Sequence, residues 1–297
     1  MNYEEFKEQL LFHVQNQFSE DTSVRIQEVQ KNNGLILDAL IINEPEVNIS
    51  PTIYINPIFK DYEKEPTDKE FEIIVRDIVK TYYDHKNDLN LDIHIFDQFD
   101  EIKEHIVYRL INYEKNRELL SEVPHIPYLD LAIVFVCLFP STDAGTGSVL
   151  IRNEHAAFWQ VSTKELFRIA KKNTPKLLPY DLRNMGSWIK ELFPSEMKDD
   201  TLQQLPLYVL TNDLKIHGAC CILYKELLKQ VAERFASDIV ILPSSVHEVL
   251  LMPSYYSNTT DELNALVRQV NTDEVRDEEI LSDHIYYYDR KTNTVSY

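Results

Sequence analysis

The stretch ILPSSVHEVLLMP, Ile241–Pro253, has two apolar runs on either side of a short polar segment. The runs predict two strands, Asp238 to Leu242 and Val246 to Met252, because short apolar runs bounded by turn residues are typical of buried strands. The polar residues are Ser244, Ser245, His247 and Glu248. They indicate either a site or a Pro-Ser-Ser turn whose hydroxyl groups bond nearby backbone.

A catalytic role for these residues requires a particular geometry. Successive side chains of a strand alternate between its faces, so Ser245 and His247 would lie together with Glu248 opposite. A nucleophile, a base and an orienting carboxylate would then come together only if the turn rotates one of them. The chain has no G-x-S-x-G elbow. The candidates therefore stay open as a site, with the turn as the favoured interpretation.

Patterns before this stretch predict a small N-terminal lobe. Apolar residues four apart indicate a first helix. Asn33-Gly34 between apolar runs indicates a hairpin, since both residues tolerate positive φ. A strand is expected over Pro51 to Asn56. Thr67 and Glu70 have the spacing of a capping box at the start of a further helix. This order, α-β-β-β-α, covers about the first 85 residues.

The rest of the chain predicts a larger mixed lobe. The expected elements are a helix from about Phe99 to Leu120, a strand over Leu131 to Phe139, a helix capped by Ser162 and Glu165, a long helix after Gly218, a helix capped by Thr259 and Glu262, and a hairpin over Ile285 to Tyr297. We therefore predict an α+β fold of two lobes, residues 1–92 and 93–297, the larger with an antiparallel sheet.

The charge of the chain limits its partners. Its 49 acidic and 30 basic residues give a formal charge of −19, which disfavours direct nucleic-acid binding. The acid is concentrated at Asp273, Glu274, Asp277, Glu278, Glu279 and Asp283. These residues indicate a solvated face, an acidic surface for a basic protein, or a decoy of a nucleic-acid-binding protein. None of the 5 glycines lies in a nucleotide-binding motif, and we expect no cofactor.

Cysteine usage and hydropathy indicate the compartment. Three cysteines, two of them adjacent, do not form a disulfide framework, which favours a reducing cytoplasm. The longest apolar run, Leu131 to Phe139, is too short to span a bilayer. We expect a cytoplasmic protein without a membrane anchor.

Two other groups of residues favour structural roles. Cys220 follows His217 and Gly218 and could be an activated thiol, but its spacing to later leucines predicts a core position. Asp92 and His94, with Asp97 or His105, could approach a metal, but no zinc spacing occurs in the chain. We therefore predict no metal site. The terminal tyrosine-rich strand, with an exposed edge, could pair with another protein.

Segments of this chain resemble two known protein families. WQVSTKELFRIAKKN, Trp159 to Asn173, and ASDIVILPSSVHEVLLM are similar to elements of the YtpQ-like family of bacterial proteins. That family has a Pro-His-Arg/Gln-Asp string at the turn, where this chain has Pro243, Ser244, Ser245 and Val246. The blocks VYRLINYEKNRELL, VPHIPYLDLAIVF and ILPSSVHEVLLMP resemble a second, closer bacterial family of unknown function over nearly the full length. These resemblances imply a bacterial cytosolic setting and assign no catalytic residue.

The sequence favours a non-enzymatic cytosolic binding or regulatory protein, whose partner would be another protein bound at an acidic face or an exposed strand edge. One alternative is a small hydrolase or ligand-binding enzyme that uses Ser244, Ser245, His247 and Glu248, with the Asp283-His284 pair nearby. The other is the acidic decoy.

Overall fold

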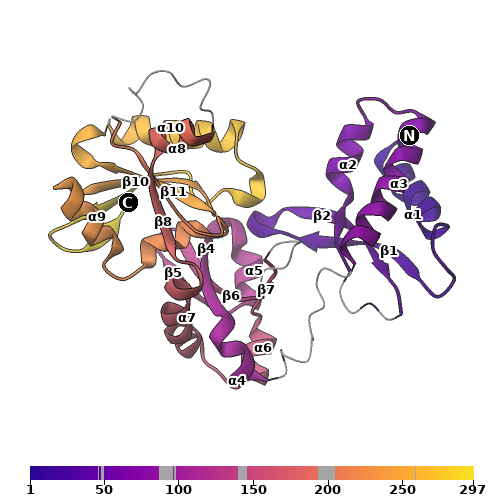
Figure 1. Ribbon diagram of the computed structural model, residues 1–297, viewed down its shortest axis with the longest axis horizontal. Coiled ribbons are helices and arrows are strands. Elements are labelled where there is room, and N and C mark those ends of the chain that lie inside the picture. The colour runs from indigo at the N-terminus through magenta and orange to yellow at the C-terminus, as the bar shows by residue number, and fades with distance from the viewer. Residues whose placement is uncertain are drawn as a thin grey trace. The chain divides into compact units, whose positions relative to one another are not determined.

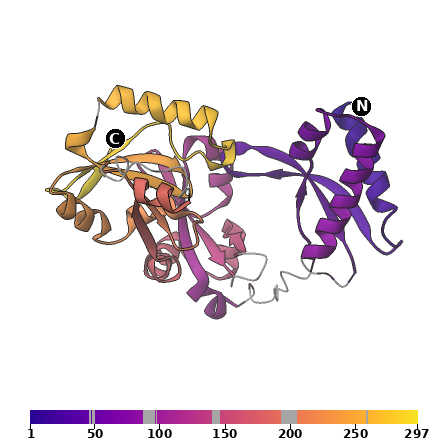
Figure 2. The ribbon, with the colours of Figure 1, turned by 45° about the horizontal axis from the view of Figure 1, so that its top comes forward.

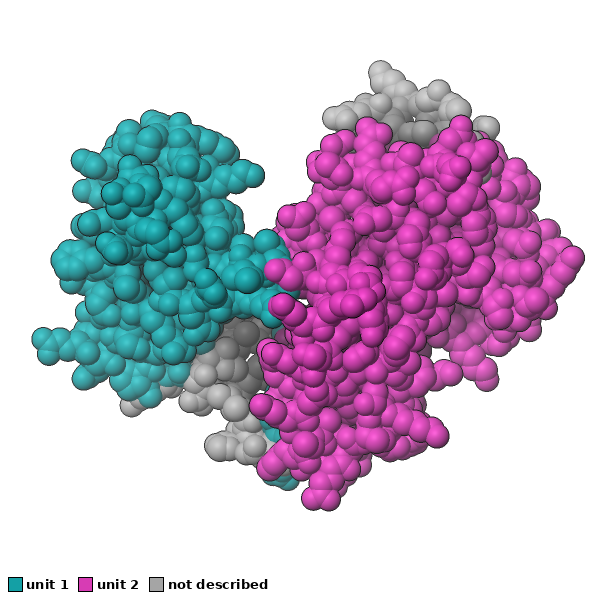
Figure 3. Space-filling view, turned by 180° about the vertical axis from the view of Figure 1, so that it is seen from behind, with its two compact units in different colours: residues 1–31, 35–98, 139–147 teal, residues 32–34, 99–138, 148–297 magenta. Residues whose placement is uncertain are grey.

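The structure, a computed structural model, describes the chain except residues 46, 48, 49, 87–95, 97, 140–145, 193–204 and 258. Residue contacts divide it into two compact units, coloured separately in Figure 3. Unit 1 comprises Met1–Lys31, Leu35–Gln98 and Phe139–Gly147, and unit 2 comprises Asn32–Gly34, Phe99–Leu138 and Ser148–Tyr297. The chain combines helices with antiparallel sheets, which confirms the α+β class. The predicted boundary between residues 92 and 93 lies outside the described residues.

Unit 1 packs helices against a small antiparallel sheet of strand order β1-β2-β3 (Figure 1). Its elements are α1 (Tyr3–Gln15), β1 (Ser23–Gln30), β2 (Ile36–Asn43), β3 (Ile53–Tyr54), α2 (Ile55–Tyr62) and α3 (Asp68–His85). The predicted hairpin is confirmed, since β1 pairs with β2 along its whole length, from Ser23 opposite Asn43 to Gln30 opposite Ile36. The core contains Phe6, Leu10, Val14, Leu40, Ile42, Ile55, Tyr62, Phe71, Val75, Ile78 and Tyr82.

The predicted third strand of unit 1 is mostly wrong. Only Ile53 and Tyr54 pair with β2, and the chain then turns into α2. Pro57 lies in the first turn of this helix, where its missing N–H costs nothing. The side chain of Asn56 accepts a hydrogen bond from the backbone N–H of Asp38 and so holds the start of the helix against β2.

Unit 2 contains two antiparallel sheets (Figure 1). One has the order β4-β6-β5, with β7 also paired to β6, and the other has the order β13-β12-β10-β11-β9-β8. Their strands are β4 (Ile106–Asn112), β5 (His125–Tyr128), β6 (Leu131–Leu138), β7 (Ser148–Leu150), β8 (Tyr180–Asn184), β9 (Tyr208–Asn212), β10 (Ile239–Ser245), β11 (Glu248–Pro253), β12 (Tyr286–Asp289) and β13 (Thr294–Ser296). Strand β6 is buried at every position.

Helices cover these sheets. The α-helices of unit 2 are α4 (Phe99–Ile102), α5 (Arg117–Glu122), α6 (Asn153–Phe158), α7 (Thr163–Leu177), α8 (Met185–Leu192), α9 (Leu227–Phe235) and α10 (Thr260–Asp273). Short 3-10 helices are η1 (Asn32–Gly34), η3 (Lys103–His105), η4 (Glu114–Asn116), η6 (Gly218–Leu223), η7 (Ser254–Tyr256) and η8 (Asp277–Glu279). Helix α7 packs on β4, and α10 lies across the six-stranded sheet, where Leu263 and Val267 contact Val240 and Leu242 (Figure 2).

Two helix predictions in unit 2 are wrong. The expected helix from Phe99 to Leu120 is split, and its centre is strand β4. The run Ile106–Asn112 is buried on both faces and rich in β-branched residues, so its apolar spacing does not distinguish helix from strand. The long helix after Gly218 is also split, because Glu226 has left-handed backbone (φ 63°) between η6 and α9.

Other local predictions are confirmed. Thr67, Ser162 and Thr259 cap α3, α7 and α10, each accepting a backbone N–H three residues later. The terminal hairpin forms between β12 and β13. In the described part of the chain, no helix has both the length and the apolar character that a bilayer crossing requires.

Candidate functional site

The serine–histidine element lies where β10 turns into β11. The register shifts between Pro243 and Ser245, so that Ser245 pairs with Glu248 across the turn. The Oγ of Ser245 accepts the backbone N–H of His247 at 3.0 Å. The Oγ of Ser244 donates to Oε1 of Glu248 at 3.2 Å. Both hydroxyl groups are therefore engaged within the turn itself, as Ser side chains in tight turns commonly are.

The ring of His247 has different partners. Its Nδ1 accepts the backbone N–H of His217 at 3.2 Å, and its Nε2 lies 3.3 Å from Oε1 of Glu279. Because Nδ1 accepts, the neutral ring must carry its proton on Nε2, where it can donate to the carboxylate. The ring also stacks on His217 with centroids 5.8 Å apart and planes 15° apart. These contacts fix the orientation and tautomer of His247.

The backbone at His247 closes against Gly218. The Oγ1 of Thr211 donates to the carbonyl oxygen of His247 at 2.8 Å. A Cβ at Gly218 would meet these two oxygens at 2.4 Å or less and the Cα of Thr211 at 2.9 Å. Only glycine therefore permits this approach of η6 to β9 and the β10–β11 turn.

The loop before Gly218 has an unusual backbone. Lys215 (φ 56°) and His217 (φ 53°) both adopt the left-handed region. The buried side chain of Asn212 holds the loop, accepting the N–H of Leu214 and donating to the carbonyl of Ile216. Left-handed non-glycine residues are strained, and such strain is found preferentially at functional sites. His217 combines this backbone with a buried ring nitrogen that has no partner, and this combination makes it a candidate.

Arg109 is a cation in the middle of the otherwise apolar strand β4. It lies opposite Val134 in the register, so both side chains leave the same face of the sheet. Its neighbours Val107 and Ile111 belong to apolar clusters on that face. The Nε of Arg109 is buried without a hydrogen-bond partner, and no carboxylate in the described part of the chain pairs with its guanidinium.

The charge of Arg109 acts on His217. Ile216 packs in the same cluster as Val107, and η6, which begins after His217, contacts β4. Burial lowers the pKa of His217 well below its ordinary value, and the charges of Arg109 and then His247 lower it further. Burial lowers the pKa of Arg109 to about 10, so it stays charged at neutral pH. The Nδ1 of His217 is also buried without a partner. The site thus combines a charged guanidinium on β4 with a neutral imidazole just before η6, the element that contacts β4.

A second polar cluster is centred on Asp130, in the β5–β6 turn. Its Oδ1 accepts the hydroxyl of Tyr286 at 2.7 Å. Its Oδ2 accepts the hydroxyl of Ser282 at 2.8 Å and lies 3.3 Å from Nε2 of His284. Burial, and next the charge of Asp130, raises the pKa of Tyr286 far above its ordinary value. We call these four residues the Asp130 hub.

The Asp130 hub unites a hydroxyl, an imidazole and a carboxylate in the wrong order for a triad. Ser282 donates to Asp130 and accepts the backbone N–H of His284, whereas a nucleophilic serine must donate to the imidazole. Ser282 is also fully buried (0% exposed). The geometry is that of a structural network.

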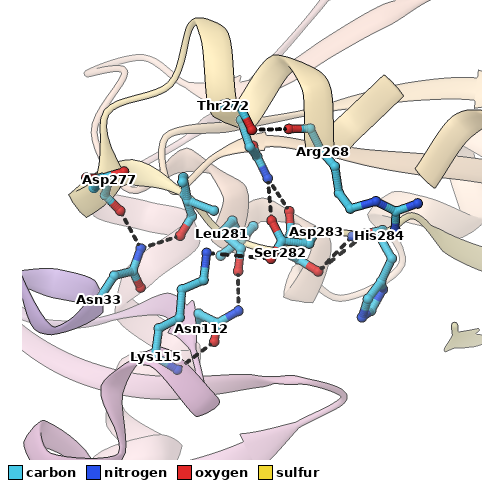
Figure 4. Close-up of polar contacts among 12 residues, drawn as sticks. Asn33, Asn112, Lys115, Arg268, Thr272, Asp277, Leu281, Ser282, Asp283 and His284 are labelled. Carbon is cyan, nitrogen blue, oxygen red and sulfur yellow. Dashed lines mark hydrogen bonds and ion pairs between the residues drawn. The ribbon is translucent and has the colours of Figure 1, made fainter. Parts of the chain in front are cut away.

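The loop Asp277–His284 connects the two clusters, and asparagine side chains hold it (Figure 4). Asn33 donates to the carbonyls of Asp277 and Ile280, Asn112 to that of Leu281, and Asn271 to that of Ser282. These amides satisfy the backbone carbonyls of a loop that pairs with no strand. The loop brings Glu279 to His247 and Ser282 to Asp130.

Several residues of the predicted acidic concentration have internal partners. Glu279 pairs with Arg276 as well as His247. Asp283 lies 3.6 Å from Nζ of Lys115 and accepts a hydrogen bond from Asn271. These contacts fold the acidic segment onto unit 2, and the partner surface predicted there stays a prediction.

The cysteines and the candidate metal ligands form no site in the described part of the chain. Cys220 and Cys221 are fully buried, and burial raises the pKa of Cys220 well above its ordinary value. Asp92, His94 and Asp97 lie outside the described residues. Within the described ranges, no group of three or more His, Cys, Asp or Glu residues could hold a metal ion.

Sequence reasoning missed Arg109, the role of Glu279 and the contacts that form the Asp130 hub. A signal for Arg109 was available, since one charge in the centre of IVYRLIN is out of place in a buried strand. Glu279 looked like one acid among many. The partners in the hub lie more than 150 positions apart, and no local pattern reports such a contact.

Comparison with known proteins gives a family and no activity. No curated protein and no solved structure matches the chain. The similarity to the YtpQ-like family stays a prediction. The expected relation to a family of unknown function is confirmed, because the model of one such family matches residues 3–290. The chain therefore belongs to the DUF5688 family, a family of unknown function.

Proposed function

We infer that this protein is a non-enzymatic binding or regulatory protein of the bacterial cytosol. The observation that carries this proposal is the hydrogen bonding of the serine–histidine element. Ser244 bonds to Glu248, Ser245 bonds to the backbone of His247, and the His247 ring bonds to His217 and Glu279. A hydrolase would need a serine within reach of the imidazole nitrogen that takes its proton. That nitrogen already accepts a backbone N–H.

A free strand edge supports a protein partner. In the described sheet of unit 1, β1 pairs with β2 and forms an edge of eight residues. Arg25, Gln27 and Glu28 are exposed along it. Charged residues on an edge discourage indiscriminate aggregation but allow a chosen extended segment to add a strand.

The first experiment tests the absence of hydrolysis. The folded full-length chain is treated with a fluorophosphonate probe and screened against ester, amide and phosphoester substrates. We expect neither labelling of Ser244 or Ser245 nor turnover. Turnover that is lost in Ser245→Ala and His247→Ala, but kept in Ser237→Ala, would establish the hydrolase and reject the proposal.

The second experiment tests the partner. A photo-cross-linking residue replaces Gln27 on β1, and a control replaces Glu154, an exposed residue of α6 in unit 2. In bacterial cells we expect one stoichiometric adduct at position 27 and none at position 154. Equal, diffuse cross-linking at both positions would count against a specific edge partner.

A further inference from the structure

We propose that Arg109 and His217 form a binding site for one oxyanion group, a carboxylate or a phosphate. The site lies outside the serine–histidine turn, so this inference goes beyond the proposed function and assigns a class of ligand. The ligand is the counter-ion that the folded chain does not itself supply to Arg109.

The first argument is the missing counter-ion. A desolvated charge is costly unless it is paired, and buried arginines are normally paired. Three other partly buried cations of this chain follow that rule. Lys7 lies 3.3 Å from Asp38, Lys86 lies 3.0 Å from Glu44, and Lys115 lies 3.6 Å from Asp283. Arg109 departs from it in a chain with 49 acidic residues. Because no carboxylate of the described chain pairs with Arg109, an external anion can act as its counter-ion.

The second argument is the chemistry of the donors. The guanidinium of Arg109 offers N–H groups in a fixed fork, which matches two oxygens of a carboxylate or phosphate. The buried Nδ1 of His217 has no partner and can supply a further N–H in the appropriate tautomer. The low pKa of His217 beside Arg109 keeps its ring neutral, so the pair carries one positive charge. One charge suits one anionic group.

The third argument is the rigidity of the site. Arg109 lies on β4, and His217 is held by its backbone bond to His247, by the ring stack, and by the left-handed loop before Gly218. Preorganised donors lose little entropy on binding. Arg109 as a residue is partly exposed although its Nε is buried, and we infer that an anion enters from this exposed part.

The experiment measures anion-dependent stabilisation of the full-length chain. Thermal unfolding is followed in inorganic phosphate, in acetate, and in chloride at the same ionic strength. A ligand that binds the folded state alone raises the midpoint, and tenfold excess over Kd corresponds to a rise of about 3 °C. We expect this rise with phosphate or acetate relative to chloride. The stronger of the two identifies the anionic group.

Two variants locate the effect. Arg109→Met removes the guanidinium but keeps the chain volume, and it should abolish the response. Arg117→Met removes an exposed arginine that pairs with Glu114, and it should keep the full response. No response of the native chain to either oxyanion, or an unchanged response in Arg109→Met, would overturn the proposal.

A direct measurement covers the case in which Arg109→Met does not fold. In ¹⁵N-labelled native protein, the buried Nε–H of Arg109 should give a protected cross-peak, assigned by its disappearance in Arg109→Lys. Addition of phosphate or acetate should shift this cross-peak. A cross-peak that stays in place at saturating oxyanion would equally overturn the proposal, whatever the outcome of any activity screen.

Discussion

Arg109 lies on strand β4 and Asp130 lies in the β5–β6 turn of the same small sheet, and they differ in how fully they are paired. Asp130 accepts two hydroxyl groups and faces an imidazole. Arg109 has a buried Nε without a partner and no paired carboxylate in the described part of unit 2. The satisfied Asp130 hub stabilises the fold, whereas the unsatisfied Arg109 is the group for which we propose an external anion.

The largest expected effect comes from breaking the Asp130 hub. Asp130→Ala leaves the hydroxyls of Tyr286 and Ser282 buried without an acceptor, and we expect a loss of about 3 kcal/mol in the free energy of unfolding. Urea denaturation measures it. The control is Asp283→Ala in the same loop as Ser282, which removes the half-exposed pair with Lys115 and one hydrogen bond from Asn271 and should cost about 1 kcal/mol. Equal losses in the two variants would remove the distinction between a hub and a surface pair.

The next effect tests the packing behind His217. Gly218→Ala drives a Cβ into backbone atoms of Thr211 and His247, and we expect destabilisation by about 2 kcal/mol. Gly34→Ala is the comparison, because its Cβ meets nothing closer than 3.4 Å and only its φ of +71° is unfavourable, worth about 1 kcal/mol. Urea midpoints of both variants measure the difference. A milder effect at Gly218 than at Gly34 would show that the loop can relax.

The sequence predicted those features that depend on residues close together in the chain. Local signals decide the caps at Thr67, Ser162 and Thr259, and the hairpin at Asn33-Gly34, because each depends on residues a few positions apart. Strand β4 was missed because its burial on both faces removes the alternation that identifies a strand. The interruption of the predicted helix at Glu226 was missed because no glycine or proline marks it in the sequence.

The candidate site was only partly predictable, for a related reason. His247 and the two serines stand together in the sequence, so their turn could be anticipated. The contacts that decide their roles are non-local: His217 and Glu279 reach the ring of His247 from positions about 30 residues before and after it. Arg109 adds a third distant segment. Composition predicted the excess of acid but not which carboxylates fold inward.

A smaller effect concerns protonation of His217. Its folded pKa is depressed, so below the unfolded value of about 6.5 the unfolded state binds more protons and stability falls with falling pH. This residue contributes a slope of about 1.4 kcal/mol per pH unit below pH 6.5 and no slope above it. His217→Asn should flatten the profile, and asparagine tolerates the left-handed backbone. Urea midpoints between pH 5 and pH 8 measure the difference between the two proteins, and a constant difference over this range would contradict a buried neutral ring.

The smallest effect distinguishes a turn serine from a nucleophile. Ser245→Ala removes the acceptor of one backbone N–H, which should cost about 1 kcal/mol of stability. Ser244→Ala, whose hydroxyl bonds a partly exposed carboxylate, should cost less. Neither change should alter the phosphate or acetate response, because the oxyanion site depends on Arg109 and His217. Urea denaturation gives the first two values and thermal unfolding the third. If Ser245→Ala removed the anion response while leaving stability intact, the β10–β11 turn and the Arg109–His217 pair would have to be one site. The distinction between a turn whose hydroxyl groups are satisfied and a separate, unsatisfied anion site would then be wrong.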